Sequence, residues 1–410
     1  MRILILSWEY PPYVVGGMGK HVAEIVPELG GLPTSRGPLY VDVVTTRYTG
    51  DAPVEQLNRY TTIHRVETPP LAPLDLYNSV VTNNSPLLDY ALELGRTHDY
   101  DGIQTHDWLT GQAAIELKYA WKTPLLTTIH ATERGRYRDH MADPTSHAID
   151  RMEWRLCHES WRAIVCSNFM VGELHNFFGT PRDKIEMIPN GIDLRHIKPC
   201  PPDVLREMRQ LYAPNGERLL FYVGRIVYEK GLHVLLRAMP IILDRYPNTR
   251  LLVAGKNSHE MLPLARELGI ESAVSFLGFV SNQRRDCIYQ TVDAAVFPSL
   301  YEPFGIVALE AMALGCNVIA SDVGGLSEVV RHLQTGLTSF PGDPASIAWA
   351  VDYLFRHPEQ AEQWRRWASY EVRTRYNWQG IARRTAEVFA EVAEERDVHS
   401  FPTRRSSERV

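Results

Sequence analysis

Residues 298–315 read Pro-Ser-Leu-Tyr-Glu-Pro-Phe-Gly-Ile-Val-Ala-Leu-Glu-Ala-Met-Ala-Leu-Gly, and the rest of the chain is organised around this stretch. Before it, residues 293–297 form a short apolar run, as a buried parallel strand would. Residues 306–314 have helical spacing, and Gly315 stands where that helix should end. The stretch therefore predicts a strand, a loop and a helix, with the loop at the carboxyl end of the strand, where open α/β sheets bind ligands.

Two glutamates flank the predicted start of this helix. Glu302 lies in the loop and Glu310 in the second turn, while residues 304–306 would supply the first free backbone N–H groups. A helix N-terminus attracts anions, but two carboxylates would repel a phosphate, so a neutral ligand rich in hydroxyl groups suits the site better. The alternative is that Glu302 is an ordinary helix-start acid and Glu310 a surface residue.

Composition excludes several classes of protein. The 410 residues are 44% hydrophobic and 22% charged, which is typical of a soluble protein of two or three domains. The net charge of −6 argues against a nucleic-acid partner or an anionic membrane surface. No run is long enough to span a membrane, and the apolar run at 3–6 is too short for a signal peptide. The five cysteines show no paired spacing, so we expect neither a disulfide framework nor a zinc site, and a reducing cytoplasm fits best.

The first half alternates strands and helices, which predicts a parallel sheet. The first strand, 2–7, leads into a glycine-rich loop at 10–20 and a helix at 22–29. The loop contains Gly16 and Gly17, which would let the backbone approach a ligand closely. It is not a Walker loop, because Lys20 is followed by histidine, although a dinucleotide fold stays open from this loop alone. Further strands are expected at 41–45, 102–105, 125–129, 163–166 and 184–188.

Two of these strands end on residues that can carry chemistry. The strand at 102–105 runs into His106-Asp107-Trp108, and the strand at 125–129 ends on His130. A histidine at the carboxyl end of a strand is placed for a ligand site, with a core histidine as the alternative. The acidic pair Asp99 and Asp101 resembles a metal-binding motif, but it precedes a strand directly and is better explained as its solvated entry.

A second Rossmann-like domain begins after the stiff segment Lys-Pro-Cys-Pro-Pro at 198–202. We expect its strands at 219–223, 250–254, 274–277, 293–297 and 317–320. Gly224 and Arg225 open the loop after the first strand, and Lys230 follows five residues later, so two cations could converge on one diphosphate. A solvated basic turn is the alternative. Helices are expected at 343–357 and 359–376, and a last helix at 378–395 should return to the first domain.

The final residues look foreign to this pattern. We interpret 397–410 as a disordered tail, and our hypothesis for 399–407 is an artefact, because a common sequencing adapter can encode those residues.

Together these motifs resemble retaining GT-B glycosyltransferases of family 4, in particular the glycogen-synthase-like members. The resemblance covers about residues 1–395 and rests on the paired glycines at 16–17, His-Asp-Trp at 106–108, Thr-Ile-His-Ala-Thr at 128–132, Pro-Asn-Gly-Ile-Asp at 189–193 and the glutamate pair. It implies an α/β fold with an acceptor-side domain at 1–198, a nucleotide-sugar domain at 199–376 across a cleft, and a helix at 377–396 on the first domain. It also implies no catalytic metal and no cofactor beyond the donor, a UDP- or ADP-sugar.

The resemblance also assigns roles to residues. Arg225 and Lys230 would neutralise the donor diphosphate, Glu302 would hold hydroxyls of the donor sugar, and Glu310 would take the ribose. His130 would support the reacting sugar face, with Asp107 and Asn190 nearby. The remaining donor contacts implied are Gly16, Gly17, Gly224, Val280, Phe304, Gly305 and Ile306.

The acceptor implied is a glycan, and glucose addition to an α-glucan is our first choice, with a sucrose-type or mannosyl transferase next. Bacterial starch and glycogen synthases of the sister family carry lysine where this chain has Val14, which puts their ADP-glucose specificity in doubt. Two other classes stay open. A sugar-nucleotide epimerase or a non-catalytic binder would use the same groups, whereas a dinucleotide oxidoreductase would leave the glutamate pair and the cations without a role.

Overall fold

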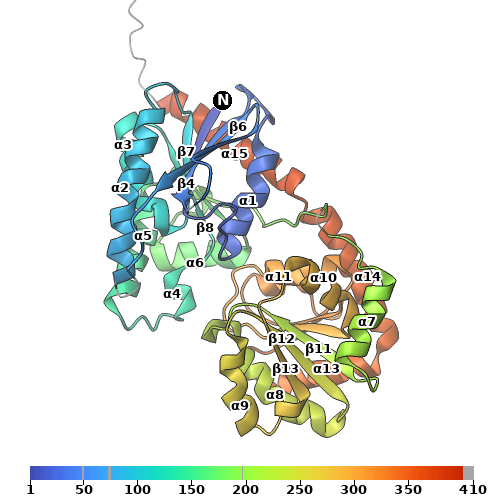
Figure 1. Cartoon of the computed structure of the whole chain (residues 1–410). Helices are drawn as coiled ribbons and strands as arrows, with labels where there is room; N and C mark the ends of the chain where they lie inside the picture. The colour runs from blue at the N-terminus through green and yellow to red at the C-terminus, as the bar shows by residue number, and fades with distance from the viewer. Residues whose placement is uncertain (49, 73–74, 196, 400–410) are drawn as a thin grey trace, which may run out of the picture. The chain divides into compact units, whose positions relative to one another are not determined.

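The computed structural model describes residues 1–48, 50–72, 75–195 and 197–399, which form two compact α/β units (Figure 1). The first unit comprises Met1–Ile188 and the chain from Trp378 onward, and the second comprises Pro189–Asn377. Of the tail predicted at 397–410, residues 400–410 lie outside the described residues, and 397–399 are helical instead. Among the helices that the structure describes, none is long and apolar enough to cross a bilayer.

The first unit is built on an eight-stranded sheet in the order β10-β9-β8-β7-β1-β4-β6-β5. Its strands are β1 (Arg2–Ser7), β4 (Tyr40–Arg47), β5 (Val54–Asn58), β6 (Thr61–Glu67), β7 (Gly102–His106), β8 (Leu125–Ile129), β9 (Arg162–Val165) and β10 (Ile185–Met187). Every pair is parallel except β5 with β6, so the predicted parallel sheet is confirmed. The pair β5 and β6 was not predicted, nor was the small hairpin of β2 (Pro33–Thr34) and β3 (Gly37–Pro38).

Strand β1 shows how the sheet is covered on both faces, because its side chains alternate between them. Ile3 and Ile5 pack with α1 (Gly17–Leu29) and α15 (Trp378–His399), while Leu4 and Leu6 face the opposite helices. Each fully buried aliphatic side chain contributes about 1.5–3 kcal/mol. The opposite helices are α2 (Leu76–Leu94), α3 (Gly111–Trp121) and α5 (Pro144–Glu159), and α4 (Glu133–Arg136) and α6 (Asn168–Phe178) complete the unit.

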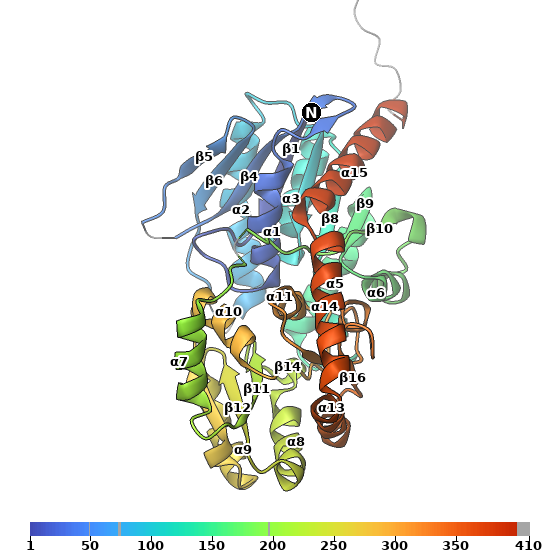
Figure 2. The same ribbon diagram turned by 90° about the vertical axis from the view of Figure 1, so that its right-hand side faces the viewer.

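Helix α15 confirms the predicted return to the first domain. It lies along α1, as Figure 2 shows, and Trp378 and Phe389 are buried in the shared core. The helix reaches His399, beyond the end at 395 expected from the sequence. Helix α1 also differs from expectation, since it begins at Gly17 instead of after residue 20.

The second unit contains a six-stranded, fully parallel sheet in the order β13-β12-β11-β14-β15-β16. Its strands are β11 (Arg218–Val223), β12 (Thr249–Ala254), β13 (Val274–Gly278), β14 (Ala294–Phe297), β15 (Val318–Ser321) and β16 (Leu337–Ser339). The order changes direction between β11 and β14, and a ligand crevice is expected outside the carboxyl ends of the strands at such a point.

Helices cover both faces of this second sheet (Figure 1). One buried cluster joins α8 (Leu232–Arg245), α9 (Leu262–Glu267) and α13 (Pro344–Arg356) to the sheet. The remaining helices are α7 (Pro202–Tyr212), α10 (Asn282–Thr291), α11 (Ile306–Ala313), α12 (Leu326–Val329) and α14 (Pro358–Arg375). Helix α11 starts at the residue predicted, and Gly315, with φ of +71°, follows its end.

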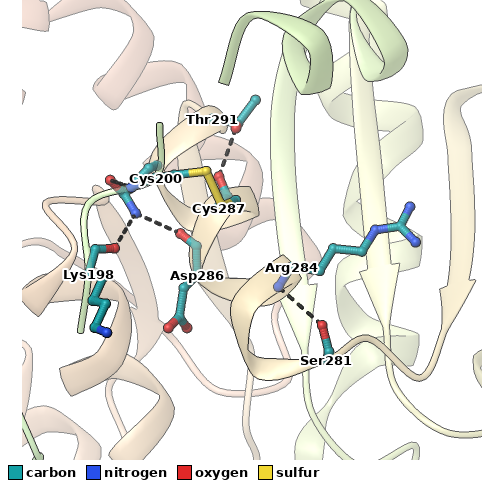
Figure 3. Close-up of a disulfide and its surroundings, with 8 residues drawn as sticks. Lys198, Cys200, Ser281, Arg284, Asp286, Cys287 and Thr291 are labelled. Atoms are coloured by element: carbon teal, nitrogen blue, oxygen red, sulfur yellow. Dashed lines mark hydrogen bonds between the residues drawn. A yellow bond between two sulfur atoms is a disulfide. The ribbon is translucent and has the colours of Figure 1, made fainter. Parts of the chain in front are cut away.

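The expectation that the cysteines form no disulfide is wrong for one pair. Cys200 and Cys287 are bonded, with their Cα atoms 5.3 Å apart and a sequence separation of 87 (Figure 3). Gln290 supports the arrangement, since its side chain accepts from the Cys200 N–H at 3.1 Å and donates to the Lys198 carbonyl. The bond ties the segment that enters the second unit to α10.

We predict that non-reduced, unfolded protein exposes three alkylatable thiols and reduced protein five, because Cys157, Cys166 and Cys316 lie outside the bond. Closing so long a loop should also make Cys200→Ser less stable by about 2–4 kcal/mol. Mass spectrometry after alkylation and urea unfolding measure the two effects. Five reactive thiols without reductant would contradict the bond.

Candidate active site

The centre of the second unit's site is an ion pair between two loops. Lys230 Nζ lies 2.6 Å from Glu302 Oε2, and Glu302 is 8% exposed. Lys230 follows β11, and Glu302 follows the neighbouring strand β14, so the sheet order brings the two motifs together. The carbonyl of Glu229 accepts hydrogen bonds from the N–H groups of residues 300 and 301, at 2.7 and 3.3 Å.

Gly231 explains why a glycine follows this lysine. Its φ is +68°, and a Cβ atom added there would lie 1.9 Å from the carbonyl oxygen of Pro298. Any side chain would therefore force the two loops apart.

The second predicted cation, Arg225, lies beside the same loop. Its Nη2 is 3.3 Å from Glu229 Oε1, its side chain is half exposed, and its carbonyl accepts a hydrogen bond from Tyr222 at 2.9 Å. Burial raises the pKa of Tyr222, and the negative charges of Glu302 and Glu229 raise it further. A single patch thus holds two cations and two carboxylates next to a neutral phenol.

Helix α11 begins at the loop that was predicted to offer free backbone N–H groups to a ligand. Gly305 caps it with φ of +101°, and no side chain caps its first turn. A Cβ on Gly305 would lie 2.6 Å from Leu326, so the tight turn from Phe304 to Ile306 requires glycine. First-turn N–H groups without a side-chain cap favour a negatively charged ligand.

Glu310 is held by a partner that sequence reasoning missed. It is 3% exposed, and Arg285 Nη1 from α10 lies 3.2 Å from its Oε1. The only sequence signal was the basic pair at 284–285, which does not reveal its partner.

Three strand ends meet at the rim of this sheet. The Gly224 N–H donates to the Ala254 carbonyl at 3.1 Å, and the Gly255 N–H donates to the Gly278 carbonyl at 2.8 Å. A Cβ on Gly255 would lie 2.3 Å from the Gly224 oxygen. Val280 lies two residues after Gly278 and is 9% exposed. The turn at 254–255 thus contacts both Gly224 and Gly278, and the predicted residue Val280 lies in the loop that follows Gly278.

The first unit gathers a separate group of residues at the ends of β7 and β8. Asp107 Oδ1 accepts the backbone N–H of His130 at 2.7 Å, and His106 Nδ1 lies 3.0 Å from His130 Nε2. The His21 ring stands edge-on to His130, with centroids 4.8 Å apart, and packs against Trp378 of α15. Asp107 has φ of +55°, a strained conformation that is common at functional sites.

Burial sets the charge state of this group. It lowers the pKa of His130 to about 3 and the pKa of His106 well below its usual range, so both imidazoles are neutral. Burial also raises the pKa of Asp107 to about 6, although its hydrogen bond from His130 acts in the opposite direction.

Glu153 of α5, whose charge interacts with that of Asp107, was not predicted. It is 3% exposed, burial raises its pKa well above the usual value, and the Glu133 N–H donates to both of its oxygens, at 2.9 and 3.1 Å. The sequence did contain a signal for Glu153. It lies four residues after Ile149 and three before Leu156, which puts a glutamate on the apolar face of a helix.

The three histidines are also a possible metal-ligand set, because ring nitrogens of His21, His106 and His130 lie within 4.8 Å of one another. Neutral imidazoles suit a transition metal such as zinc. A metal would have to replace the hydrogen bond between His106 and His130. That the reaction needs no metal stays a prediction.

Three residues predicted to contact the donor lie elsewhere in the chain. The Gly16 N–H donates to Glu9 Oε2 at 3.2 Å, and Gly17 is the first residue of α1. Asn190 is 5% exposed and belongs to the second unit, where Ile192 bonds to Tyr376, so its proximity to His130 stays a prediction.

We predict that Asp107→Asn changes how stability depends on pH. The pKa of Asp107 is raised from 3.8 to about 6, so the folded protein favours the protonated carboxyl, and wild type loses stability relative to the variant as pH rises through this window. The loss in free energy of unfolding relative to the variant should approach roughly 3 kcal/mol above pH 6. Asparagine is the suitable replacement because it tolerates the positive φ of this position. Urea unfolding at about pH 4.5 and about pH 7.5 tests this, and a constant difference between the proteins would contradict it.

Comparison with protein families assigns both halves of the chain. Residues 15–196 match the Glycosyltransferase Family 4 model, and residues 203–369 match Glycosyl transferases group 1. A glycosyltransferase of Methanocaldococcus jannaschii is 34% identical over 95% of this chain and 98% of its own length. Glycogen synthase of Mycobacterium tuberculosis is 33% identical over 95% of this chain and 94% of its own length. A D-inositol 3-phosphate glycosyltransferase of Corynebacterium urealyticum is 29% identical over 95% of each chain.

Solved structures agree with the fold. Sucrose-phosphate synthase from Thermosynechococcus elongatus superposes with a TM-score of 0.81 at 25% identity, over 96% of this chain and 99% of the other. Anabaena HepE in complex with UDP-glucose superposes with a TM-score of 0.73 at 19% identity, over 95% of this chain and 100% of the other. The second likeness supports the fold alone.

Proposed function

The chain belongs to glycosyltransferase family 4, whose members are retaining hexosyltransferases that use nucleotide sugars, and we propose that it moves glucose from UDP- or ADP-glucose to an α-glucan. The observation that carries the proposal is the contact between Lys230 and Glu302. The contact supports the proposal because a cation suited to a diphosphate lies directly beside a carboxylate suited to sugar hydroxyls, at the carboxyl edge of a parallel sheet.

In this proposal the second unit binds the donor. Arg225, Lys230 and the N-terminus of α11 neutralise the diphosphate, whose negative charge grows as the bond to the sugar breaks. Glu302 accepts hydrogen bonds from the sugar hydroxyls, and Glu310, oriented by Arg285, takes the ribose. Stabilising the leaving group and positioning it are the two large general sources of rate, and one preorganised donor alone contributes about 3–4 kcal/mol.

The first unit would act on the sugar and the acceptor. His130 is neutral and held by Asp107 and His106, so it would act through hydrogen bonds and not as a cation. Retention can occur by attack on the same face, with the departing phosphate oxygen taking the acceptor proton. We favour this route because a double displacement would need a carboxylate beneath the anomeric carbon, and no sequence motif points to one.

The choice of glucose and α-glucan rests on the glycogen synthase relative, while the inositol-phosphate relative makes a phosphorylated acceptor the second candidate. UDP-glucose is bound by Anabaena HepE. A cytoplasmic location belongs to the same proposal. The Cys200–Cys287 bond argues against that location, because disulfides are rare in the cytosol.

Product analysis tests the proposal directly. Wild type incubated with UDP- or ADP-glucose and maltooligosaccharide should extend the chain with one donor strongly preferred. Transfer to inositol phosphate instead would favour the second candidate, and no transfer from either donor to either acceptor would overturn the proposal.

Glu302→Ala should abolish transfer, because the variant loses the acceptor for sugar hydroxyls and leaves Lys230 without its partner. Glu362→Ala, which removes a helix-surface carboxylate on α14, is the matched control and should retain activity. Initial rates at saturating donor measure the effect, and a Glu302→Ala rate within a few fold of wild type would falsify the assigned role.

The charge-swapped variant Lys230→Glu/Glu302→Lys separates structure from function. It keeps an ion pair between the loops, so its unfolding midpoint should stay close to that of wild type, while donor binding and transfer should be lost. Lys230→Ala alone should weaken donor binding on the order of tenfold or more. Active charge-swapped enzyme would mean that the pair is only structural.

A further inference from the structure

The second unit contains a hollow whose lining residues are different from those assigned above. It has a volume of about 550 Å³ and opens at the carboxyl ends of β15 and β16, beside α13. Small-molecule sites commonly have volumes of about 300–1,000 Å³. The hollow is therefore large enough for a short oligosaccharide.

Exposed aromatic side chains line it. Phe340 is 70% exposed and Trp349 is 45% exposed, and both line the same hollow. The His332 ring stacks on Trp349, with centroids 6.0 Å apart and an angle of 22° between the planes. Neighbouring exposed aromatic groups mark binding surfaces, and their flat faces pack on the C–H faces of sugar rings.

The polar groups of the hollow are acidic or neutral. Asp322 is exposed at its edge, and Asp343 caps α13 by accepting the Ala345 N–H at 2.9 Å. The Thr338 N–H donates to His332 Nδ1 at 3.0 Å, so in the neutral ring the proton sits on Nε2. Carboxylates repel phosphates and other anions but accept hydrogen bonds from hydroxyl groups.

The loop around the aromatic residues is held in place. Ser346 Oγ accepts the Phe340 N–H at 2.9 Å, and the Asp322 N–H donates to the Ser339 carbonyl at 2.8 Å. Such local bonds reduce the entropy lost on ligand binding.

The hollow also lies close to the candidate donor site within the same unit. The Gly325 N–H, three residues after Asp322, donates to the Glu302 carbonyl at 3.0 Å. On the other side, a Cβ on Gly342 would lie 3.7 Å from Leu300 of the Glu302 loop. The two loops that border the hollow therefore contact the loop that carries Glu302.

We propose that this hollow is a second, non-catalytic binding site for α-glucan chains, with Phe340 and Trp349 as the stacking surface. The inference rests on the proposed function, because it takes the acceptor to be a glucan. Such a site would hold a polymer at the enzyme between transfers. Long glucans should gain affinity from it, whereas an acceptor too short to span both sites should not.

The test compares Phe340→Ala/Trp349→Ala with a control variant that also loses two exposed aromatic side chains. Trp367→Ala/Tyr370→Ala removes two exposed aromatic residues of α14 that are absent from the lining of the hollow. All three proteins are run by affinity electrophoresis in gels containing glycogen, a measurement that does not depend on catalysis. The first variant should bind glycogen about tenfold more weakly, and the control should bind like wild type.

Kinetics supply the second measurement. KM for glycogen should rise on the order of tenfold in the first variant, while kcat and KM for maltotriose stay at wild-type values. Unchanged glycogen affinity in the first variant, or an equal loss in the control, would overturn the proposal. If the first variant is active and binds glycogen normally, this site is refuted and the proposed function stands. If wild type is inactive but binds glycogen only through the hollow, transfer is refuted and the site stands.

Discussion

The ion pair between Lys230 and Glu302 is the interaction on which the second unit's site depends. The two charges come from loops 72 residues apart, and Glu302 is almost fully buried. A pair in such a place gains little net stability, because removing both charges from water costs about as much as their attraction returns. Its presence is better explained by a ligand that needs both charges. The close contact of Gly231 with Pro298 and the bonds to the Glu229 carbonyl hold the two loops in the geometry that the pair requires.

The two units differ in how they use charge. The second unit concentrates ionised groups, with Arg225, Lys230 and Arg285 each beside a carboxylate. The first unit places His130 beside the neutral imidazole of His106 and the buried Asp107, and holds Glu153 buried as well, both carboxyls with raised pKa. An anionic leaving group needs the first kind of environment, whereas an oxocarbenium-like sugar is better served by hydrogen bonds that add no positive charge. The proposed function makes use of this division, because it assigns the donor to the second unit and contacts with the reacting sugar to the first.

Much of the local structure could be predicted, because it follows from short-range patterns. The strand, loop and helix around Glu302 were placed to within a residue, and strand 125–129 matched its observed bounds. Strands β5 and β6 were missed, since their polar residues give no apolar run. The early start of α1 was missed because the paired glycines at 16–17 resemble a loop, although packing of Val22 and Ile25 against the sheet stabilises the helix.

The sequence by itself determined the class of fold and the family, because apolar periodicity and the spacing of glycines, cations and glutamates are properties of neighbouring residues. Only the tertiary structure decided which distant groups meet. It joined Lys230 to Glu302, gave Glu310 its partner Arg285, bonded Cys200 to Cys287 and brought the Glu153 carboxyl to the backbone of Glu133. These contacts depend on strand order and helix packing, which bring residues far apart in the chain within bonding distance. No local pattern contains that information.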